Sequence, residues 1–340
     1  MKISARRKLL LAGQGCFLLL LCLTLIAAFS GSPSALAAGR VSVVQSVTQD
    51  SLPLLAMDTL PSPVTVQDFA KTALNKLAAE APFTAWKDAT TEYYPLGPGT
   101  HSWLVNVLKG EQRIGYMIIS ATEQGGYMLS EYGAGTYGLP YSLTDLRQFL
   151  VQKGLITSSF TGQIKLTALY APLLPVWKVE IAEKILFINA SVPQLLPWTL
   201  SKAEEVLKGP HIEADVITTL TTELSPQTVF NSGGTDDPYR DMLWLTSPIL
   251  PAVSGDNIAA FIPPKTSIAY QAAGRNDLVG APFMITGYQS WLPASNTVQT
   301  AYNKTAVYAA SGPEGKRFLP LTALQTCGTL HKLPERAAHQ

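Results

Sequence analysis

The stretch HSWLVNVLKGEQRIGYMIISATEQGGYMLSEYGAG, residues 101–135, decides the fold. Side chains alternate between the two faces of a β-strand, and glycines favour the tight turns that join antiparallel strands. Gly110 and the pair Gly125–Gly126 stand in two such connections. The stretch therefore predicts a three-stranded antiparallel meander. Its strands are expected at 103–108, 115–119 and 127–132.

Two helices are expected to pack against this meander. Apolar residues follow a helical stripe from Val66 to Glu80, and Thr65 precedes them as a cap. A second helix follows Ser142, because Ser142 and Asp145 have the spacing of a capping box and Gly154 suits the end of the helix.

A second sheet unit and a turn-rich region complete the chain. A short helix capped by Ser201 with Glu204 is expected to end at Gly209–Pro210. Beyond it, short apolar runs between glycines and prolines predict a small, barrel-like β module. The strands of the second unit are expected at 164–170, 176–181 and 185–188, and those of the module at 283–288, 306–309 and 318–321. Together these elements predict an α+β fold: antiparallel sheet units with short packing helices, followed by a β-rich C-terminal module.

The N-terminus has the pattern of an export signal. Four cations precede an apolar run at 9–29, and Ala35-Leu36-Ala37 fits the site that a signal peptidase cuts. If the segment is cut, the protein is secreted; if it is kept, the run is long enough to anchor the chain in a membrane. Both alternatives place the body outside the cytoplasm. The expected organisation is a signal peptide or anchor (1–38), a linker (39–63), an α+β domain (64–200), a β-rich domain (201–330) and a flexible tail (331–340).

Charge excludes one class of partner. Without the four cations at 2, 6, 7 and 8, the remaining chain carries 21 basic and 24 acidic residues, a net charge of −3. Binding to nucleic acid depends on clustered Lys and Arg side chains. We therefore expect no nucleic-acid partner.

Cysteine and histidine offer few catalytic groups. Cys327 is the one cysteine outside the export signal, so no internal disulfide is expected in the body. Cys327 with His331 is a Cys/His pair, but little chain follows it to build a pocket. His101 and His211 lack the motifs of a hydrolase or a zinc site. No catalytic residue and no cofactor are predicted.

Two loops contain residues of the kind found in ligand-binding sites. The string Gly133-Ala-Gly-Thr-Tyr-Gly138 fits a dinucleotide-binding pattern, but an antiparallel meander precedes it, which favours a simple turn. Asp236, Asp237 and Asp241 offer oxygen ligands for calcium, against the alternative of a solvated turn.

Aromatic residues and glycosylation-type triplets are the last candidates. Aromatic residues at strand positions usually belong to the core, although they could also form a stacking surface. The triplets begin at Asn189 and Asn303. The aromatic residues concerned are Trp177, Trp198, Trp244, Trp291, Tyr239, Tyr288, Tyr302 and Tyr308.

The meander carries a family resemblance. Gly115-Tyr-Met-Ile-Ile-Ser120, followed by Gly126-Tyr-Met-Leu-Ser-Glu-Tyr-Gly-Ala-Gly135, resembles the prodomain sheet of streptopain-type exported cysteine peptidases. The stretch 169–197, with Trp177-Lys178-Val179, is similar to the second strand set of such modules. The resemblance implies a prodomain-like module at 64–200 that packs on a partner. No peptidase domain follows it here, so no catalytic residue is carried over.

These observations predict an exported, non-catalytic protein that binds another protein or a component of the cell envelope. If the N-terminal segment is not cut, the membrane is a further partner. The alternative is an exported hydrolase of peptide or glycan whose active site has no recognisable motif.

Overall fold

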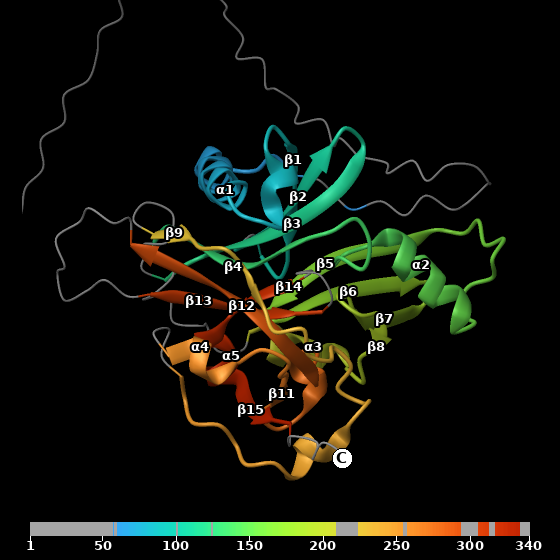
Figure 1. The fold of residues 1–340 in the computed structure, drawn as a ribbon. Helices are drawn as coiled ribbons and strands as arrows, with labels where there is room; N and C mark the ends of the chain where they lie inside the picture. Colours follow the sequence, from blue (N-terminus) through green and yellow to red (C-terminus); the bar gives the residue numbers. More distant parts are fainter. Residues whose placement is uncertain are drawn as a thin grey trace, which may run out of the picture. The chain divides into compact units, whose positions relative to one another are not determined.

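The predicted meander lies at one end of a large antiparallel sheet in a computed structural model (Figure 1). The structure describes residues 57, 60–99, 101–123, 125–208, 224–253, 257–293, 305–312 and 317–333. An edge strand, β1, joins the three expected strands on one side. The four strands are β1 (Thr90–Leu96), β2 (Ser102–Lys109), β3 (Gln112–Ala121) and β4 (Tyr127–Ala134).

The C-terminal strands continue this sheet through β14, which pairs with β4 at Phe318 and Tyr132. In the described part they extend the sheet of the meander, where the sequence suggested a separate, barrel-like module. The order runs β1-β2-β3-β4-β14-β13-β12-β11-β15, and β9 and β10 also pair with β12. The added strands are β9 (Leu224–Pro226), β10 (Phe230–Asn231), β11 (Ile268–Ala272), β12 (Phe283–Pro293), β13 (Ala306–Ser311), β14 (Arg317–Pro320) and β15 (Gly328–Lys332).

A second antiparallel sheet has the order β5-β6-β7-β8. Its first three strands confirm the expected second unit. The turn between β5 and β6 is tight, with Leu173 at a positive φ of 65°. Leu173 is nevertheless buried, in a hydrophobic cluster built mainly from C-terminal residues. The strands are β5 (Ile164–Ala171), β6 (Leu174–Ile181), β7 (Lys184–Asn189) and β8 (Gln194–Leu195).

Helix caps show where local sequence signals succeed and fail. Ser142 caps α2 as predicted, since its Oγ accepts a hydrogen bond from the Asp145 backbone N–H at 3.2 Å. The predicted cap Ser201 is wrong: Thr199 Oγ1 accepts from the Lys202 N–H, so the helix starts earlier. The helices are α1 (Val64–Leu77), α2 (Leu143–Gln152), α3 (Leu200–Leu207), α4 (Ile258–Phe261) and α5 (Leu321–Cys327), with 3-10 turns η1 (Phe83–Trp86), η3 (Met242–Thr246) and η5 (Asn276–Leu278).

The predicted cap Thr65 is also wrong. Pro63 stands before the first helical residue of α1, and Thr65 lies inside the helix. The Thr65 hydroxyl hydrogen-bonds the Tyr127 hydroxyl at 3.0 Å and so ties α1 to β4.

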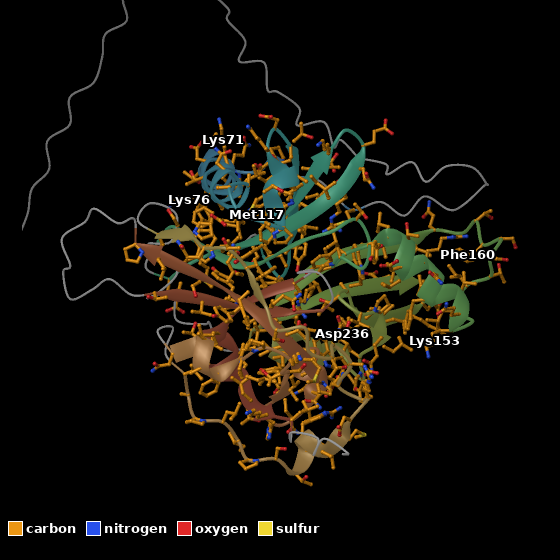
Figure 2. All side chains as sticks on the ribbon, viewed as in Figure 1. Lys71, Lys76, Met117, Lys153, Phe160 and Asp236 are labelled. Carbon is orange, nitrogen blue, oxygen red and sulfur yellow. The ribbon has the colours of Figure 1, made fainter. Side chains whose placement is uncertain are left out.

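Both faces of the meander are buried. On one face, Val105 and Met117 pack against α1, and Figure 2 labels Met117 beside that helix. On the other face, Leu104 and Ile118 pack with α2 and the second sheet. The centre of the meander is thus an inner layer, where the polar side chains of Asn106 and Glu131 are buried.

The structure tests the predictions for the two ends of the chain only in part. The predicted export segment and the alanines Ala35 and Ala37 lie outside the described residues. Of the helices in the described ranges, none is long and apolar enough to span a bilayer. His331 and Lys332, expected in the tail, belong to β15.

Candidate functional site: an exposed apolar segment

The Cys/His pair of the sequence, Cys327 and His331, does not have the geometry of an activated thiolate. Both ring nitrogens of His331 already have partners: Nδ1 lies 3.1 Å from the Ser247 carbonyl oxygen, and Nε2 lies 3.0 Å from Thr329 Oγ1. Burial raises the pKa of the Cys327 thiol, which favours its neutral form. Of the other histidines, His101 is exposed, and His211 lies outside the described residues.

The glycine string Gly133–Gly138 leads out of the sheet into a connecting turn. Its first two residues, Gly133 and Ala134, end the antiparallel strand β4, and the Gly135 N–H donates to the Ile114 carbonyl oxygen at 3.1 Å. Gly135 and Gly138 have φ angles of 139° and 63°, which glycine adopts freely. The prediction of a simple turn, made because an antiparallel meander precedes the string, is confirmed.

Two of the three aspartates that were candidate calcium ligands, Asp237 and Asp241, bind nearby backbone N–H groups. Asp237 Oδ1 accepts from the Tyr239 N–H at 2.8 Å, and Asp241 Oδ1 accepts from the Leu243 N–H at 3.1 Å. Asp236 is exposed. Among the described residues, no group of three or more His, Cys, Asp or Glu side chains is placed to hold a metal ion.

Most of the aromatic candidates are core residues. Trp177, Trp198, Trp244, Trp291 and Tyr308 are buried. Tyr288 is half-buried and Tyr302 lies outside the described residues, whereas Tyr239 is 64% exposed.

The triplet at Asn189 is not presented as a free acceptor. Asn189 is 5% exposed, and its Oδ1 accepts hydrogen bonds from the Ser191 and Val192 N–H groups. It therefore shapes the turn after β7. Asn303 lies outside the described residues.

An exposed apolar segment around η3 is the strongest candidate for a functional surface. We call residues 239–249 the apolar segment. Five large side chains in these eleven residues are about half exposed or more, although a folded protein usually buries such groups. The exposed fractions are 64% for Tyr239, 51% for Met242, 54% for Leu243, 48% for Leu245 and 63% for Ile249.

Trp244 fixes the apolar segment to the sheet. Its side chain is 1% exposed and packs with Ala269 of β11 and Met284 of β12. Its indole Nε1 donates to the Pro238 carbonyl oxygen at 2.8 Å. One buried side chain thus holds the segment while its neighbours on either side face outward.

The polar backbone groups of the apolar segment are also bound within the protein. The Leu243 carbonyl oxygen accepts from Thr246 Oγ1 at 3.0 Å and from Ser247 Oγ at 3.1 Å. The Leu250 N–H, just beyond the segment, donates to the Leu330 carbonyl oxygen of β15 at 2.8 Å. These backbone groups are therefore already occupied within the protein, and the exposed side chains around them are mainly hydrocarbon.

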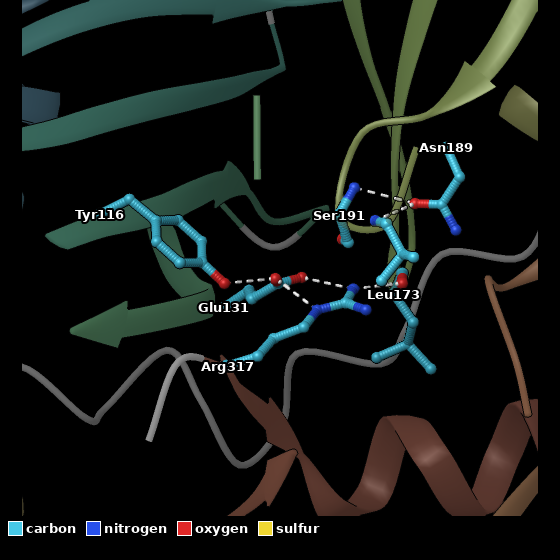
Figure 3. Close-up of polar contacts among 7 residues, drawn as sticks. Tyr116, Glu131, Leu173, Asn189, Ser191 and Arg317 are labelled. Carbon is cyan, nitrogen blue, oxygen red and sulfur yellow. Dashed lines mark hydrogen bonds and ion pairs between the residues drawn. The ribbon is translucent and has the colours of Figure 1, made fainter. Parts of the chain in front are cut away.

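A second unpredicted feature is a buried ion pair where β4 meets β14. Arg317 Nε lies 2.6 Å and its Nη2 3.0 Å from the two oxygens of Glu131, as Figure 3 shows. The Tyr116 hydroxyl donates to Glu131 Oε1 at 2.6 Å, and Arg317 Nη2 also donates to the Leu173 carbonyl oxygen at 2.5 Å. Since both carboxylate oxygens are occupied and Glu131 is 0% exposed, this cluster joins parts of the fold and is closed to substrate.

A buried arginine on the same face of the meander, Arg113, is also inaccessible to a ligand from solution. Arg113 Nη1 donates to the Pro140 carbonyl oxygen at 2.8 Å, and burial lowers the pKa of Arg113 to about 10. Its Nε and Nη2 atoms, together with Asn106 Oδ1, are buried and have no hydrogen-bond partner among the described residues. Because these atoms expose almost no surface, a ligand in solution cannot reach them in this conformation.

Comparison with known proteins adds no relative, since no protein-family model, curated protein or solved structure matches the chain. The resemblance to streptopain-type prodomains stays a prediction. The functional argument therefore rests on the geometry of the apolar segment.

Proposed function

We propose that the chain is an exported, non-catalytic binding protein that docks on a protein or another component of the cell envelope through the apolar segment. The observation that carries the proposal is the exposure of five large apolar side chains around the buried Trp244. Contiguous apolar surface of this kind marks interaction sites in folded proteins. The export pattern at 1–38 supports a partner outside the cytoplasm.

The surroundings of the segment support binding over catalysis. In the described part near the segment, His331 is 5% exposed and both of its ring nitrogens are occupied. Asp237 and Asp241 accept hydrogen bonds from nearby backbone N–H groups. An exposed surface that is mainly hydrocarbon suits recognition of a partner.

The test is site-specific photo-crosslinking in producing cells, with a photoreactive amino acid in place of Leu245. Val192 is the matched control, because it is an aliphatic residue that is 70% exposed in the turn between β7 and β8. We expect an envelope adduct from position 245 and none from position 192. Equal adducts from both positions would contradict docking through the segment.

Cell fractionation with N-terminal sequencing tests the export part of the proposal. We expect the protein outside the cytoplasm, either cut after Ala37 or with its N-terminus intact and held in the membrane fraction. Recovery of the intact chain from the soluble cytoplasmic fraction would contradict export.

A further inference from the structure

The chemistry of the apolar segment identifies its partner more closely. Resting on the proposed function, we infer that the segment seats in the interfacial layer of a lipid bilayer. The first ground is charge: the twelve residues from Met242 to Val253 contain no charged side chain. A segment that enters the boundary between headgroups and acyl chains has to be free of charge at the depth that it reaches.

The second ground is the state of the backbone. A polar group that enters lipid without a partner is costly, because no water replaces its hydrogen bond there. In water, an exposed loop has no such need. The Leu243 carbonyl oxygen nevertheless accepts from two hydroxyls, and the N–H groups of Leu243, Ser247 and Leu250 all donate within the protein.

The third ground is the order of side chains along the segment. The charged residues Arg240 and Asp241 come immediately before the charge-free stretch, beside the exposed Tyr239. Tyrosine prefers the level of the headgroups, where its ring is in apolar surroundings and its hydroxyl in polar ones. Aliphatic side chains follow, so the segment passes from headgroup chemistry to acyl-chain chemistry.

These grounds favour a lipid bilayer over two other partners, a different protein and a second copy of this chain. Protein interfaces contain about one hydrogen bond per 100–200 Å², and the exposed side chains here offer mainly hydrocarbon. In a symmetric dimer, the same patch on both copies would bring the aspartates at 236 and 237 toward their counterparts. A bilayer requires neither hydrogen bonds nor complementary charge.

The acidic flank adds a specific expectation about lipid type. Asp236 and Asp237 are exposed beside the segment, and Figure 2 labels Asp236. Carboxylates near an anionic surface are repelled. Binding to vesicles of phosphatidylcholine should therefore weaken when phosphatidylglycerol is added, and D236N/D237N should reduce that loss.

The experiment measures binding of the exported protein, as recovered from cells, to phosphatidylcholine vesicles. L243D/L245D should weaken binding by more than about tenfold, because it places two carboxylates among the acyl chains. The control V192D/I185D changes two exposed aliphatic residues near β7 and should stay within about twofold of the wild type. Thermal unfolding checks that both variants fold.

A second measurement does not depend on loss of binding. L245W and V192W each add one exposed tryptophan, and vesicles with brominated acyl chains quench indoles that enter the bilayer. We expect added quenching in L245W and none in V192W. No added quenching in L245W overturns the lipid inference. Equal vesicle binding by wild type and L243D/L245D also overturns it.

The two experiments distinguish a failure of the lipid inference from a failure of the proposed function. A protein adduct from position 245 in cells, without quenching in L245W, would overturn the lipid inference and leave docking through the segment in place. Concentration-dependent dimers that L243D/L245D abolishes would assign the surface to a second copy and likewise overturn the lipid inference.

Discussion

The pair Glu131–Arg317 shows what a single buried contact contributes to the fold. Both oxygens of Glu131 are bound, and Arg317 also reaches the carbonyl oxygen of Leu173. Removing one partner of such a pair leaves a buried charge without compensation. We expect Arg317→Met to lower the free energy of unfolding by about 3–5 kcal/mol, measured by urea denaturation.

An exposed pair in the same protein provides the control. Arg275 also makes two hydrogen bonds to one carboxylate, that of Asp277, but its side chain is 62% exposed. We expect Arg275→Met to cost about 0–1 kcal/mol. Equal costs for the two variants would contradict the role assigned to burial.

The buried tyrosines predict a limit to stability in alkali. Burial raises the pKa of Tyr116, Tyr132 and Tyr308 well above the usual value. Below about pH 10 these phenols are neutral in both folded and unfolded chains. Above it, the unfolded chain ionises first, so the free energy of unfolding should fall by about 1.4 kcal/mol per pH unit for each such tyrosine.

Urea unfolding between about pH 9 and about pH 11 measures this slope. Phenolate absorbance of the folded protein provides the control, because the buried Tyr116, Tyr132 and Tyr308 should stay neutral while the fold is intact. Full ionisation of all tyrosines near pH 10 in the folded protein would contradict the prediction.

At the scale of elements, α3 offers a test of which residue starts a helix. Thr199 Oγ1 accepts from the Lys202 N–H, whereas Ser201 is already inside the helix. We expect Thr199→Ala to lower the free energy of unfolding by about 1 kcal/mol in urea denaturation. Ser201→Ala should change it little, since alanine favours helix interiors. A larger loss for Ser201→Ala than for Thr199→Ala would contradict this and identify Ser201 as the cap, as the sequence suggested.

Sequence reasoning succeeded where the signal is local. The alternation at 103–108 and the glycines in the connections predicted strands that the structure confirms. The Ser142 cap was found because its partner lies three residues away. The pairing of Phe318 with Tyr132 was missed, because no local pattern shows which strands meet across such a sequence separation.

The candidate site was harder to predict than the fold. An apolar run such as Met242-Leu-Trp-Leu245 usually indicates core, and only Trp244 meets that expectation. The available signal was the absence of charge between Met242 and Val253. Glu131 was missed for the opposite reason: an acidic residue in a strand usually faces water, and only tertiary structure reveals Arg317 beside it.

For the whole molecule, we expect a single unfolding transition. The expected domains 64–200 and 201–330 share one sheet, and Arg317 binds both Glu131 and Leu173 from the first of them. Parts joined through a common core usually unfold together. Circular dichroism and tryptophan fluorescence should therefore give the same midpoint in urea. Two separated midpoints would show that the domains are independent.

The joint between β4 and β14 has a consequence for how the chain comes to be folded. Glu131 and Arg317 are 186 positions apart in the sequence. During synthesis from the N-terminus, β4 therefore cannot pair with β14 until nearly the whole chain has been made. Until then, β4 lacks the neighbour it has in the finished sheet. The sheet therefore closes only late in synthesis, and this delay suits the export that we propose, because a chain passes a narrow translocation channel before it has folded.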